Sequence, residues 1–500
     1  MSILTVDVGT TSMRGILYSR NGKQLTIHRI SYQNFYSEQI YVEQDAKTWG
    51  NALVQILKVI AQYCKINHAT VSAIALTCQR SSVIPLDKEG NPLEKCIMWQ
   101  DTRTKAICSE IERYNDEIHD LTGAKVNTVF SAPKILWFKK ERRNIYNSAY
   151  KMVGIADFLN YKLTNRWVTD YTYGSRTLLM NLRSKKWDER LLQIFDIDQS
   201  KLCDLIEPGA VCGLLCTQMS METGLPEGIP IITAGGDQQC ALVGKGAIES
   251  GDLSITTGTG AFLSATCLEV PSNLSTDIIC NVSSLKNQYI IETNALSCTA
   301  GFDWFLNNFY DRCNMSYEEI AKKIDEVPVG ANGCRVLPYF QGKSAPDWNP
   351  NAKAMFANLS LGTTREDMLR GLMEAMFLEI KEKLEVMNQY VPISDVYLGG
   401  GLSKNRILNQ LQADVYGKVV KRSCREEETS IGAFLITMVC MGYFKDITFA
   451  HQEVNKNIQN ESYQPNLEKT NQYNEIMKEN GELYKINNDQ KRECRCLENE

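Results

Sequence analysis

Histidine is scarce in this chain, and the cysteines are not spaced as ligand pairs. Four histidines are present, and the 17 cysteines are scattered with no Cys-x-x-Cys anywhere. Zinc and haem sites require clustered ligands of these types, so the sequence argues against both. We expect the cysteines to be reduced thiols that act as small apolar core residues.

Long apolar runs are also missing. No uncharged apolar stretch approaches the roughly 20 residues needed to cross a bilayer. The first residues, Met-Ser-Ile-Leu-Thr-Val-Asp, lack a basic leader and reach a carboxylate at Asp7. This pattern predicts a strand rather than a signal peptide. We expect a cytoplasmic protein with no membrane partner.

The chain lacks an excess of basic residues. Lysine and arginine number 54 against 59 acidic residues, which gives a net charge of −5. A nucleic-acid partner is therefore not expected. The composition, 43% hydrophobic and 23% charged, is typical of a soluble globular enzyme. Because 500 residues exceed one ordinary core, two domains are predicted.

No Gly-x-x-x-x-Gly-Lys-[Ser/Thr] motif occurs, so a P-loop is excluded. Residues 231–262 offer a different phosphate site. Two apolar, strand-like segments end there, the first at Asp237 and the second at the turn Thr257-Gly-Thr-Gly260. A Gly/Thr turn exposes backbone N–H groups and hydroxyls, which suits a phosphate. A nearby carboxylate can take the proton of an attacking hydroxyl, so this stretch predicts phosphoryl transfer; the alternative is a capping carboxylate.

A similar turn occurs at the start of the chain. Residues 3–8, 13–19 and 24–32 read as an antiparallel meander with a hairpin signal at Asn21-Gly22. Its first turn carries three candidate phosphate ligands, and a fourth follows close by: Asp7, Thr10, Thr11 and Arg14. The recurrence of the turn halfway along the chain predicts a duplicated α/β unit.

Other strand ends carry candidate substrate contacts. Apolar residues 71–77 lead into Gln79, Arg80 and Ser81, and residues 95–103 contain Trp99 and Asp101. Ligands bind at strand ends in α/β sheets, so these side chains are candidates; a surface arginine and a core tryptophan are the alternatives.

Helices are predicted from periodicity at several places. Residues 45–63 and 368–387 have apolar residues at helical spacing, and residues 406–416 follow three glycines at 399–401. The glycines let the backbone approach a flat ligand such as adenine at a helix N-terminus. A last helix is expected near residues 473–484, with residues 485–500 frayed.

These motifs, in this order, resemble those of the FGGY family of carbohydrate kinases over roughly residues 3–450. The matching segments are Asp7-Val-Gly-Thr-Thr-Ser, Gln79-Arg80, Trp99-Gln-Asp-Thr-Arg103, Thr169-Asp-Tyr-Thr, Gly235-Gly-Asp-Gln-Gln, Thr257-Gly-Thr-Gly, and Gly399-Gly-Gly with Asn405. The family's two signature regions match imperfectly, with Val129, Asn358 and Gly371 departing from the usual residues.

The resemblance implies an α/β fold of two actin-like (ribonuclease H-like) domains with an ATP/sugar cleft between them. The expected division is an N-terminal, sugar-side kinase domain at 1–247, a C-terminal, nucleotide-side domain at 248–455, and a helix with a polar tail at 456–500. A homodimer is compatible with the resemblance.

The resemblance also implies roles for individual residues. Asp237 matches the catalytic base, and Asp7 matches the magnesium end, where the ion is held through water. Substrate contacts are expected from Arg80, Trp99, Asp237, Gln238 and Phe262, and ATP contacts from Asp7, Thr10, Thr11, Arg14, Gly258, Thr259, Gly301, Gly400, Gly401 and Asn405. The implied cofactors are ATP and Mg²⁺, and the implied partner is a small sugar or polyol.

Two positions favour a pentulose such as xylulose over glycerol. Glycerol-specific members carry a glutamate where this chain has Ser81 and a tyrosine near Val129. Losing both removes hydrogen bonds that a small triol needs and leaves room for a longer polyol. Glycerol or another polyol is the alternative, because Asp237-Gln238-Gln239 looks more like the glycerol branch. Outside the kinases, the rivals are an actin-like ATPase and a non-catalytic sugar sensor.

Overall fold

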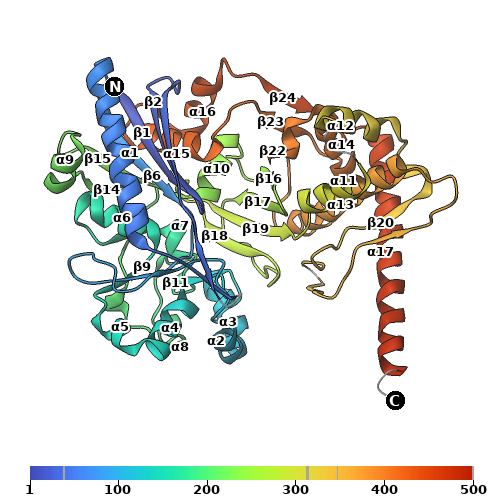
Figure 1. Ribbon diagram of the computed structural model, residues 1–500, viewed down its shortest axis with the longest axis horizontal. Coiled ribbons are helices and arrows are strands. Elements are labelled where there is room, and N and C mark those ends of the chain that lie inside the picture. The colour runs from blue at the N-terminus through green and yellow to red at the C-terminus, as the bar shows by residue number, and fades with distance from the viewer. Residues whose placement is uncertain (38–39, 311–314, 346, 498–500) are drawn as a thin grey trace. The chain divides into compact units, whose positions relative to one another are not determined.

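The computed structural model describes residues 1–37, 40–310, 315–345 and 347–497. These residues form two compact units, each built from separate stretches of the chain. The first contains Met1–Ile248, Thr266–Ile291 and Arg425–Ile458, and the second contains Glu249–Ala265, Glu292–Cys424 and Gln459–Glu500. The α/β class predicted from the sequence is confirmed (Figure 1).

The first unit is organised around a six-stranded sheet in the order β14-β15-β6-β1-β2-β3. Its strands are β1 (Ser2–Val8), β2 (Ser12–Ser19), β3 (Gln24–Ser31), β6 (Val71–Cys78), β14 (Val211–Leu214) and β15 (Pro230–Gly236). The predicted meander is confirmed, since β1, β2 and β3 pair antiparallel. Strands β6 and β15 run parallel to β1 and to each other, so their carboxyl ends lie at one edge.

Helix α1 (Ala46–Asn67) covers one face of this sheet. Asp45 caps its N-terminus by accepting a hydrogen bond from Lys47 N, and the helix ends at His68, whose φ of 52° is left-handed. Its apolar stripe, which includes Trp49, Leu53 and Ile56, is buried with the inward residues of β1. The predicted helix at 45–63 is therefore confirmed and extends one turn further.

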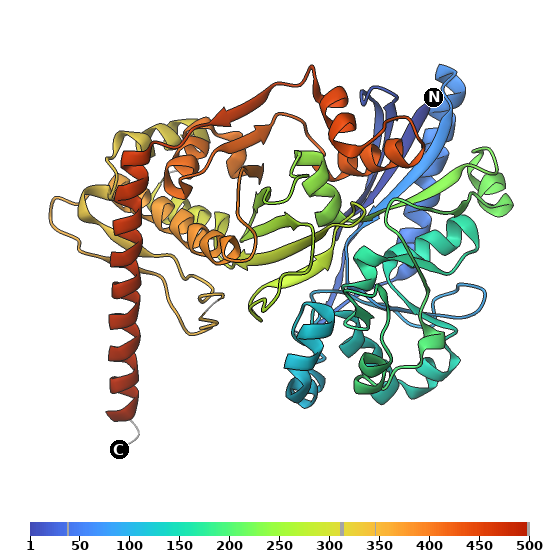
Figure 2. The same ribbon diagram turned by 180° about the vertical axis from the view of Figure 1, so that it is seen from behind.

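Helices α10 (Asp237–Lys245) and α15 (Glu428–Cys440) cover the opposite face, as Figures 1 and 2 show. Residues 425–458 consequently belong to the first unit, although the sequence suggested a linear division. The physical reason is the burial of apolar side chains. Ile431, Phe434 and Leu435 of α15 are fully buried against Ile3 and Ile16 of the sheet. The helix α16 (Ile447–Asn455) follows α15 in this unit.

The rest of the first unit is a set of short helices and strands. Some of them share a second apolar core, which includes Phe130, Phe138 and Phe195, while others, such as residues 155–164, pack into the core beneath α1. The helices are α2 (Lys105–Ile111), α3 (Asn115–Thr122), α4 (Ser131–Glu141), α5 (Arg143–Ser148), α6 (Ile155–Thr164), α7 (Tyr171–Gly174), α8 (Glu189–Ile194) and α9 (Thr217–Thr223). The strands are β4 (Phe35–Ser37), β5 (Tyr41–Gln44), β7 (Ile84–Leu86), β8 (Cys96–Ile97), β9 (Lys151–Val153), β10 (Val168–Asp170), β11 (Met180–Asn181), β12 (Lys186–Trp187), β13 (Asp204–Ile206) and β18 (Ile279–Val282).

The second unit repeats the pattern of the first, in which an antiparallel pair of strands lies next to parallel strands. Strands β17 (Ala261–Cys267), β16 (Leu253–Thr257), β22 (Val396–Gly400), β23 (Val420–Ser423) and β24 (Asn460–Tyr463) are neighbours in that order. β16 pairs antiparallel with β17 and parallel with β22. The two Gly/Thr turns thus occupy equivalent places, each joining an antiparallel pair. The chain returns to this unit within β19 (Tyr289–Ala295).

Helices of the second unit pack around the long helix α13 (Arg365–Asn388), which confirms and extends the helix predicted at 368–387. Met373, Met376 and Met387 are buried, as expected of core residues. The other elements are α11 (Thr299–Phe309), α12 (Tyr317–Glu326), α14 (Arg406–Tyr416), α17 (Leu467–Leu497), β20 (Arg335–Leu337) and β21 (Met355–Ala357).

Helix α17 is longer than the sequence predicted, because residues 485–497 are helical rather than frayed. Its first half is anchored by buried aromatic side chains: Tyr473 donates to Glu374 and accepts from Arg370 of α13, and Tyr484 packs on Tyr339. Once this half is fixed, the helix can propagate without a new nucleation step.

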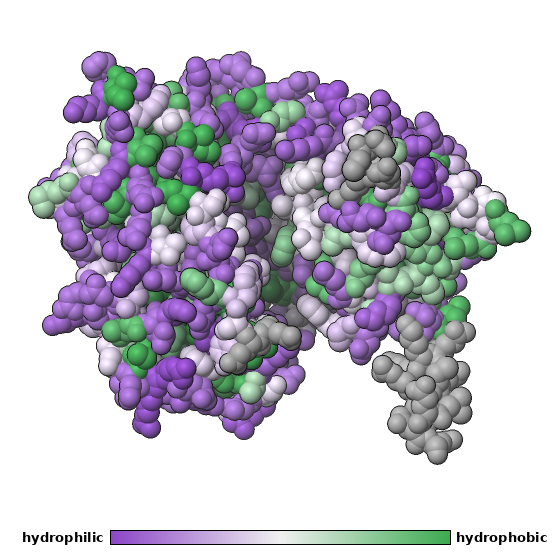
Figure 3. Space-filling view, in the orientation of Figure 1, coloured by the Kyte–Doolittle hydropathy of each residue, from purple (hydrophilic) through white to green (hydrophobic). Residues whose placement is uncertain are grey.

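The cysteines agree with the sequence prediction. Every cysteine that the structure describes is a free thiol, and most are buried. Within the described ranges, no helix is long and apolar enough to span a membrane. Hydrophilic side chains cover most of the face seen in Figure 3.

Candidate active site

In the first unit, the carboxyl ends of three parallel strands and the turn after β1 gather the predicted polar residues. β1 leads into the turn with Asp7 and Thr10, β6 ends before Gln79, and β15 ends before Asp237. Gln79 connects two of these segments, because its Nε2 donates to Gly9 O at 3.1 Å and its Oε1 lies 3.4 Å from Thr10 Oγ1. Gln79 is buried and positions the turn.

Asp237 is the first residue of α10, and its side chain is 27% exposed. Arg80 lies beside it, with Nε 3.6 Å from Asp237 Oδ1. Gly236, the residue before Asp237, makes this approach possible. A Cβ at Gly236 would lie 2.6 Å from Arg80 Cδ, and Gly235 has a φ of +104°. The strand end therefore presents a carboxylate, partly open to solvent, next to a guanidinium. Gln238 follows and is half-buried.

The turn after β1 presents hydroxyls and a cation. Thr11 is exposed and Thr10 is half-buried; Trp99 Nε1 donates to Thr10 Oγ1 at 3.3 Å. Trp99 therefore supports the turn through its indole N–H, in addition to offering an apolar face. Arg14 Nη1 lies 3.9 Å from Asp7 Oδ2, and the strand register pairs these two residues directly.

Asp7 is the one carboxylate of this turn. It is buried, and burial raises its pKa to about 7, opposed by the nearby Arg14 guanidinium. No group of three or more His, Cys, Asp or Glu side chains suited to a metal occurs among the described residues. A single carboxylate nevertheless fits Mg²⁺, which is commonly bound in kinases by one or two carboxylates, waters and the substrate phosphates.

Asp101 occupies a different environment from the one predicted. It is fully buried, and its oxygens accept hydrogen bonds from Val42 N at 2.6 Å and from Arg103 at 2.7–2.9 Å. Its carboxylate joins strand β5 to the turn that carries Arg103, so we treat it as a structural residue and omit it from the proposed substrate contacts.

Ser81 lies next to a buried arginine. Its φ is +72°, it is 8% exposed, and Arg176 Nε donates to its Oγ at 3.4 Å. Arg176 also lies over the ring of Phe130, with Cζ 4.6 Å from the centroid. Arg176 was not predicted, although it lies four residues after Thr172, the last residue of the Thr169-Asp-Tyr-Thr motif, and this position was a usable signal.

In the second unit, the turn 257–260 is tied to the start of α11. Thr299 N and Oγ1 both donate to Gly258 O, at 2.9 and 2.7 Å, and Cys298 N donates to Thr259 O. Gly258 and Thr259 are exposed on this turn. Gly400 packs so closely on β16 that a Cβ would lie 2.0 Å from Thr257 O, whereas Gly401 faces open space.

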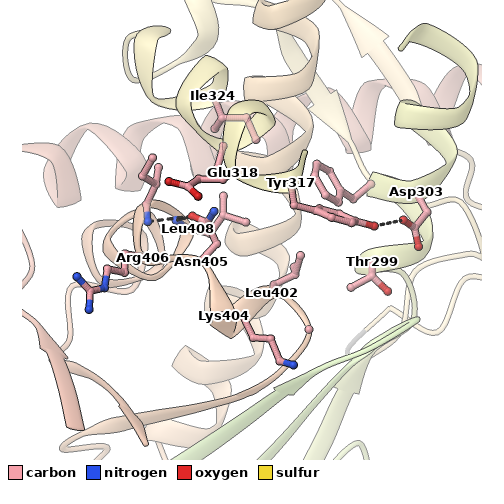
Figure 4. Close-up of a pocket in the computed structure, with 14 residues that line it drawn as sticks. Thr299, Asp303, Tyr317, Glu318, Ile324, Leu402, Lys404, Asn405, Arg406 and Leu408 are labelled. Atoms are coloured by element: carbon pink, nitrogen blue, oxygen red, sulfur yellow. Dashed lines mark hydrogen bonds between the residues drawn. The ribbon is translucent and has the colours of Figure 1, made fainter. Parts of the chain in front are cut away.

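A cavity of about 830 Å³ lies beside these residues within the second unit (Figure 4). Its lining mixes apolar and polar side chains and includes Phe302, Asp303, Tyr317, Leu402, Lys404 and Asn405. Tyr317 Oη lies 3.3 Å from Asp303 Oδ1, and Asn405 caps α14 by accepting from the N–H groups of Ile407 and Leu408. The volume and mixed lining suit a ligand of nucleotide size.

The residues predicted to contact the nucleotide lie in different places. Gly401 and Asn405 line the cavity. Gly301 instead packs inward, where a Cβ would lie 3.1 Å from the Phe340 ring. Phe262 lies on β17 of the second unit and is 53% exposed. Tyr317, which lines the cavity, was not predicted from the sequence. The Ser316–Glu319 capping box ahead of Ile320 and Ile324 is a sequence signal for the start of its helix.

Comparison with known proteins identifies both halves of the chain. The model for the FGGY family of carbohydrate kinases, N-terminal domain, matches residues 2–244, and the model for the C-terminal domain matches residues 253–441. Glycerol kinase of Thermococcus onnurineus (strain NA1) is 31% identical over 454 residues, 89% of this chain and 90% of the relative. Glycerol kinase of Clostridium perfringens (strain SM101 / Type A) is 30% identical over 92% of this chain and 95% of the relative.

Solved structures agree on the fold. The ligand-bound xylulose kinase from Lactobacillus acidophilus superposes with a TM-score of 0.89 at 22% identity, covering 97% of this chain and 98% of the other. Plasmodium falciparum glycerol kinase with ADP gives a TM-score of 0.87 at 24% identity, covering 96% and 98%. The predicted two-domain, actin-like fold is confirmed. The chain belongs to the FGGY family of carbohydrate kinases.

Proposed function

We propose that this protein phosphorylates a primary hydroxyl of a small polyol with ATP, and that glycerol is the first substrate to test. The observation that carries the proposal is the partly exposed carboxylate of Asp237 beside Arg80, at the strand end of a family member. A primary hydroxyl has a very high pKa, so its proton must leave during attack, and a carboxylate aligned on it serves as the base.

The remaining groups of the first unit suit binding and charge stabilisation. Arg80, Trp99 and Gln238 are proposed to orient the polyol, and Thr10, Thr11 and Arg14 to contact the phosphates. Mg²⁺, where bound through water at Asp7, would neutralise charge on the phosphates. Most of the acceleration is expected from alignment and from this charge stabilisation, as in other phosphoryl transfers.

ATP is proposed as the phosphoryl donor, with its nucleoside in the cavity of the second unit. The apolar side chains Phe302 and Leu402 would cover the faces of a base, and Asn405 would offer its amide at the edge. The exposed backbone of Gly258 and Thr259 suits a phosphate. A solved structure of the same fold, the Plasmodium falciparum glycerol kinase, was obtained with ADP.

Two polyols compete as the acceptor, and different observations favour each. The relatives at 30–31% identity are glycerol kinases, which supports glycerol better than the pentulose first expected from the sequence. Ser81 and Val129 remain the argument for a pentulose such as xylulose, because small side chains replace a carboxylate and a phenol that glycerol-specific members use.

The test is a coupled assay of ADP formation with glycerol, xylulose and other polyols as separate acceptors. Acceptor-dependent ADP release supports the kinase, and the ratio of kcat/KM values identifies the acceptor class. Equal ADP release with and without any acceptor would instead indicate an actin-like ATPase. Acceptor binding by calorimetry without turnover would indicate a sugar sensor.

A further inference from the structure

A carboxylate from the last part of the chain reaches the phosphate turn of the first unit. Glu427, immediately before α15, accepts hydrogen bonds from Arg14 Nη1 of β2 and from Arg29 Nη2 of β3, the latter at 3.3 Å. Arg14 and Glu427 are 413 positions apart in the sequence. The contact exists because α15 packs on β1 of the same sheet.

The backbone at Glu427 has a conformation that residues other than glycine rarely adopt. Its φ is 59° and its ψ is 50°, in the left-handed region. The side chain makes no capping hydrogen bond to α15, although it stands at the N-cap position. Helix capping therefore does not explain a glutamate here, whereas its contacts with the two arginines do.

Close helix packing fixes this position. A Cβ at Gly432 of α15 would lie 1.9 Å from Cys240 O of α10, and a Cβ at Gly244 of α10 would lie 1.9 Å from Glu428 O. The backbones of the two helices are therefore in direct contact. Because α10 begins at Asp237, the same helix pair fixes the proposed base and Glu427.

Arg14 is held between two carboxylates. Its Nη1 bonds to Glu427 and lies 3.9 Å from Asp7 Oδ2. The Arg14 side chain is 30% exposed, and that of Glu427 is 17% exposed. A long arginine side chain samples many rotamers unless it is held, and charge-assisted bonds to carboxylates are the strongest means of holding it.

We propose that Glu427 is a positioning residue for phosphoryl transfer, which acts by holding the Arg14 guanidinium at the turn where the phosphates bind. The inference rests on the proposed function, in which Arg14 contacts those phosphates. Glu427 itself touches no reacting atom. An arginine already in place when the nucleotide binds stabilises developing charge without first being ordered.

The experiment is a double-mutant cycle on kcat with the best acceptor from the panel. Glu427→Gln keeps the shape but removes the charge and is expected to lower kcat by about 10–100-fold, the range typical of outer-shell partners, with KM for the acceptor nearly unchanged. Arg14→Ala should lower kcat further. If Glu427 acts through Arg14, the double variant is no slower than Arg14→Ala alone.

Two controls separate positioning from folding. Glu427→Gly suits the left-handed backbone, so it should unfold at the wild-type temperature or above while turning over as slowly as Glu427→Gln. Arg29→Gln removes the other, more exposed partner and should leave kcat near the wild-type value.

Several outcomes would overturn the inference. Wild-type or faster turnover by Glu427→Gln would mean that Glu427 does not help the reaction, and additive losses in the cycle would mean that it acts independently of Arg14. In either case the proposed function is still supported if the wild type phosphorylates a polyol. A wild type that phosphorylates no polyol overturns the proposed function and this inference with it.

Discussion

Asp237 is partly exposed and lies beside the Arg80 guanidinium, so its carboxylate can reach a ligand at this strand end. The strand before it fixes its backbone at the start of α10, and Gly236 leaves room for Arg80 beside it. The side chain is thus held without being fully buried, which suits a general base.

Replacing Asp237, the proposed base, is the most direct test of its role. Asp237→Asn keeps the size of the side chain but removes most of its ability to accept a proton, so kcat for acceptor-dependent ADP release should fall about 100-fold or more. ATP binding, measured by calorimetry, should be nearly unchanged. Normal turnover by the variant would show that another group takes the proton.

Ser81 is the residue at which acceptor choice can be tested. Ser81→Glu places a carboxylate where glycerol-specific members carry one, next to the Arg176 guanidinium that already bonds Ser81. The kcat/KM ratio of glycerol to xylulose should rise by about tenfold, since one added hydrogen bond to a hydroxyl gives about 1–2 kcal/mol. The matched control, Ser81→Gln, has a similar size without the charge; an unchanged ratio in Ser81→Glu would exclude this position as a determinant.

At the scale of elements, α13 carries more buried charge than an ordinary core helix. Arg370 pairs with Glu374 and with Tyr473 of α17, which anchors the last helix. One turn further on, Glu379 is 5% exposed, and neither of its oxygens accepts a hydrogen bond from a described residue. Burial raises its pKa to about 7, although Lys383 and Lys343 oppose this and Glu382 adds to it.

The stability of the fold should therefore depend on pH through Glu379. Its pKa is higher in the folded chain than the ordinary value of 4.5, so the folded state holds the proton more tightly. The free energy of unfolding should fall as pH rises from that ordinary value through about 7, and Glu379→Gln, which cannot ionise, should escape this loss. At about pH 8 the variant should be more stable by about 2–3 kcal/mol.

Urea unfolding of the wild type and Glu379→Gln at about pH 6 and about pH 8 checks this prediction. The difference between the two proteins should grow with pH. Glu326→Gln, the same exchange at an exposed glutamate of α12, serves as the control. A difference that shrinks with pH would mean that the lysines, not burial, set the state of Glu379.

At the scale of the whole molecule, the two compact units do not follow the order of the chain. Residues 425–458 complete the first unit, although the second unit lies before them in the sequence. The face of the six-stranded sheet that they cover is apolar, with Ile3, Ile16 and Tyr18 buried beneath α15. The first unit is therefore complete only when nearly the whole chain is present.

A truncation tests this dependence. A chain ending at residue 424 loses α15 and should not unfold cooperatively, because the apolar face of the sheet is left exposed to water. Thermal unfolding followed by tryptophan fluorescence measures this. A chain ending at residue 488 keeps α15 and the anchors Tyr473 and Tyr484, so it should unfold like the full chain. Cooperative unfolding of both would show that α15 is dispensable.

Local patterns predicted much of the candidate site. The candidate residues at strand ends could be predicted because a polar or charged residue stands at the end of each apolar run, as at Asp7, Arg80 and Asp237. Helix α14 spans residues 406–416, as predicted; Asn405 caps its start and Gly417 follows its last residue. Ser81 and Asp101 both looked like substrate contacts in the sequence, but Ser81 bonds a buried arginine, and Asp101 joins strand β5 to the turn that carries Arg103. That difference arises from long-range packing.

The sequence by itself determined the α/β class, the two Gly/Thr turns and the family, because these depend on short-range periodicity and on motifs that stand in order along the chain. Tertiary structure alone decided the contact of Glu427 with Arg14, the assignment of residues 425–458 to the first unit, and the burial of Glu379. Each of these depends on side chains hundreds of residues apart or on helices packed together. No local pattern encodes such contacts, since they are set by which apolar faces the folded chain must cover.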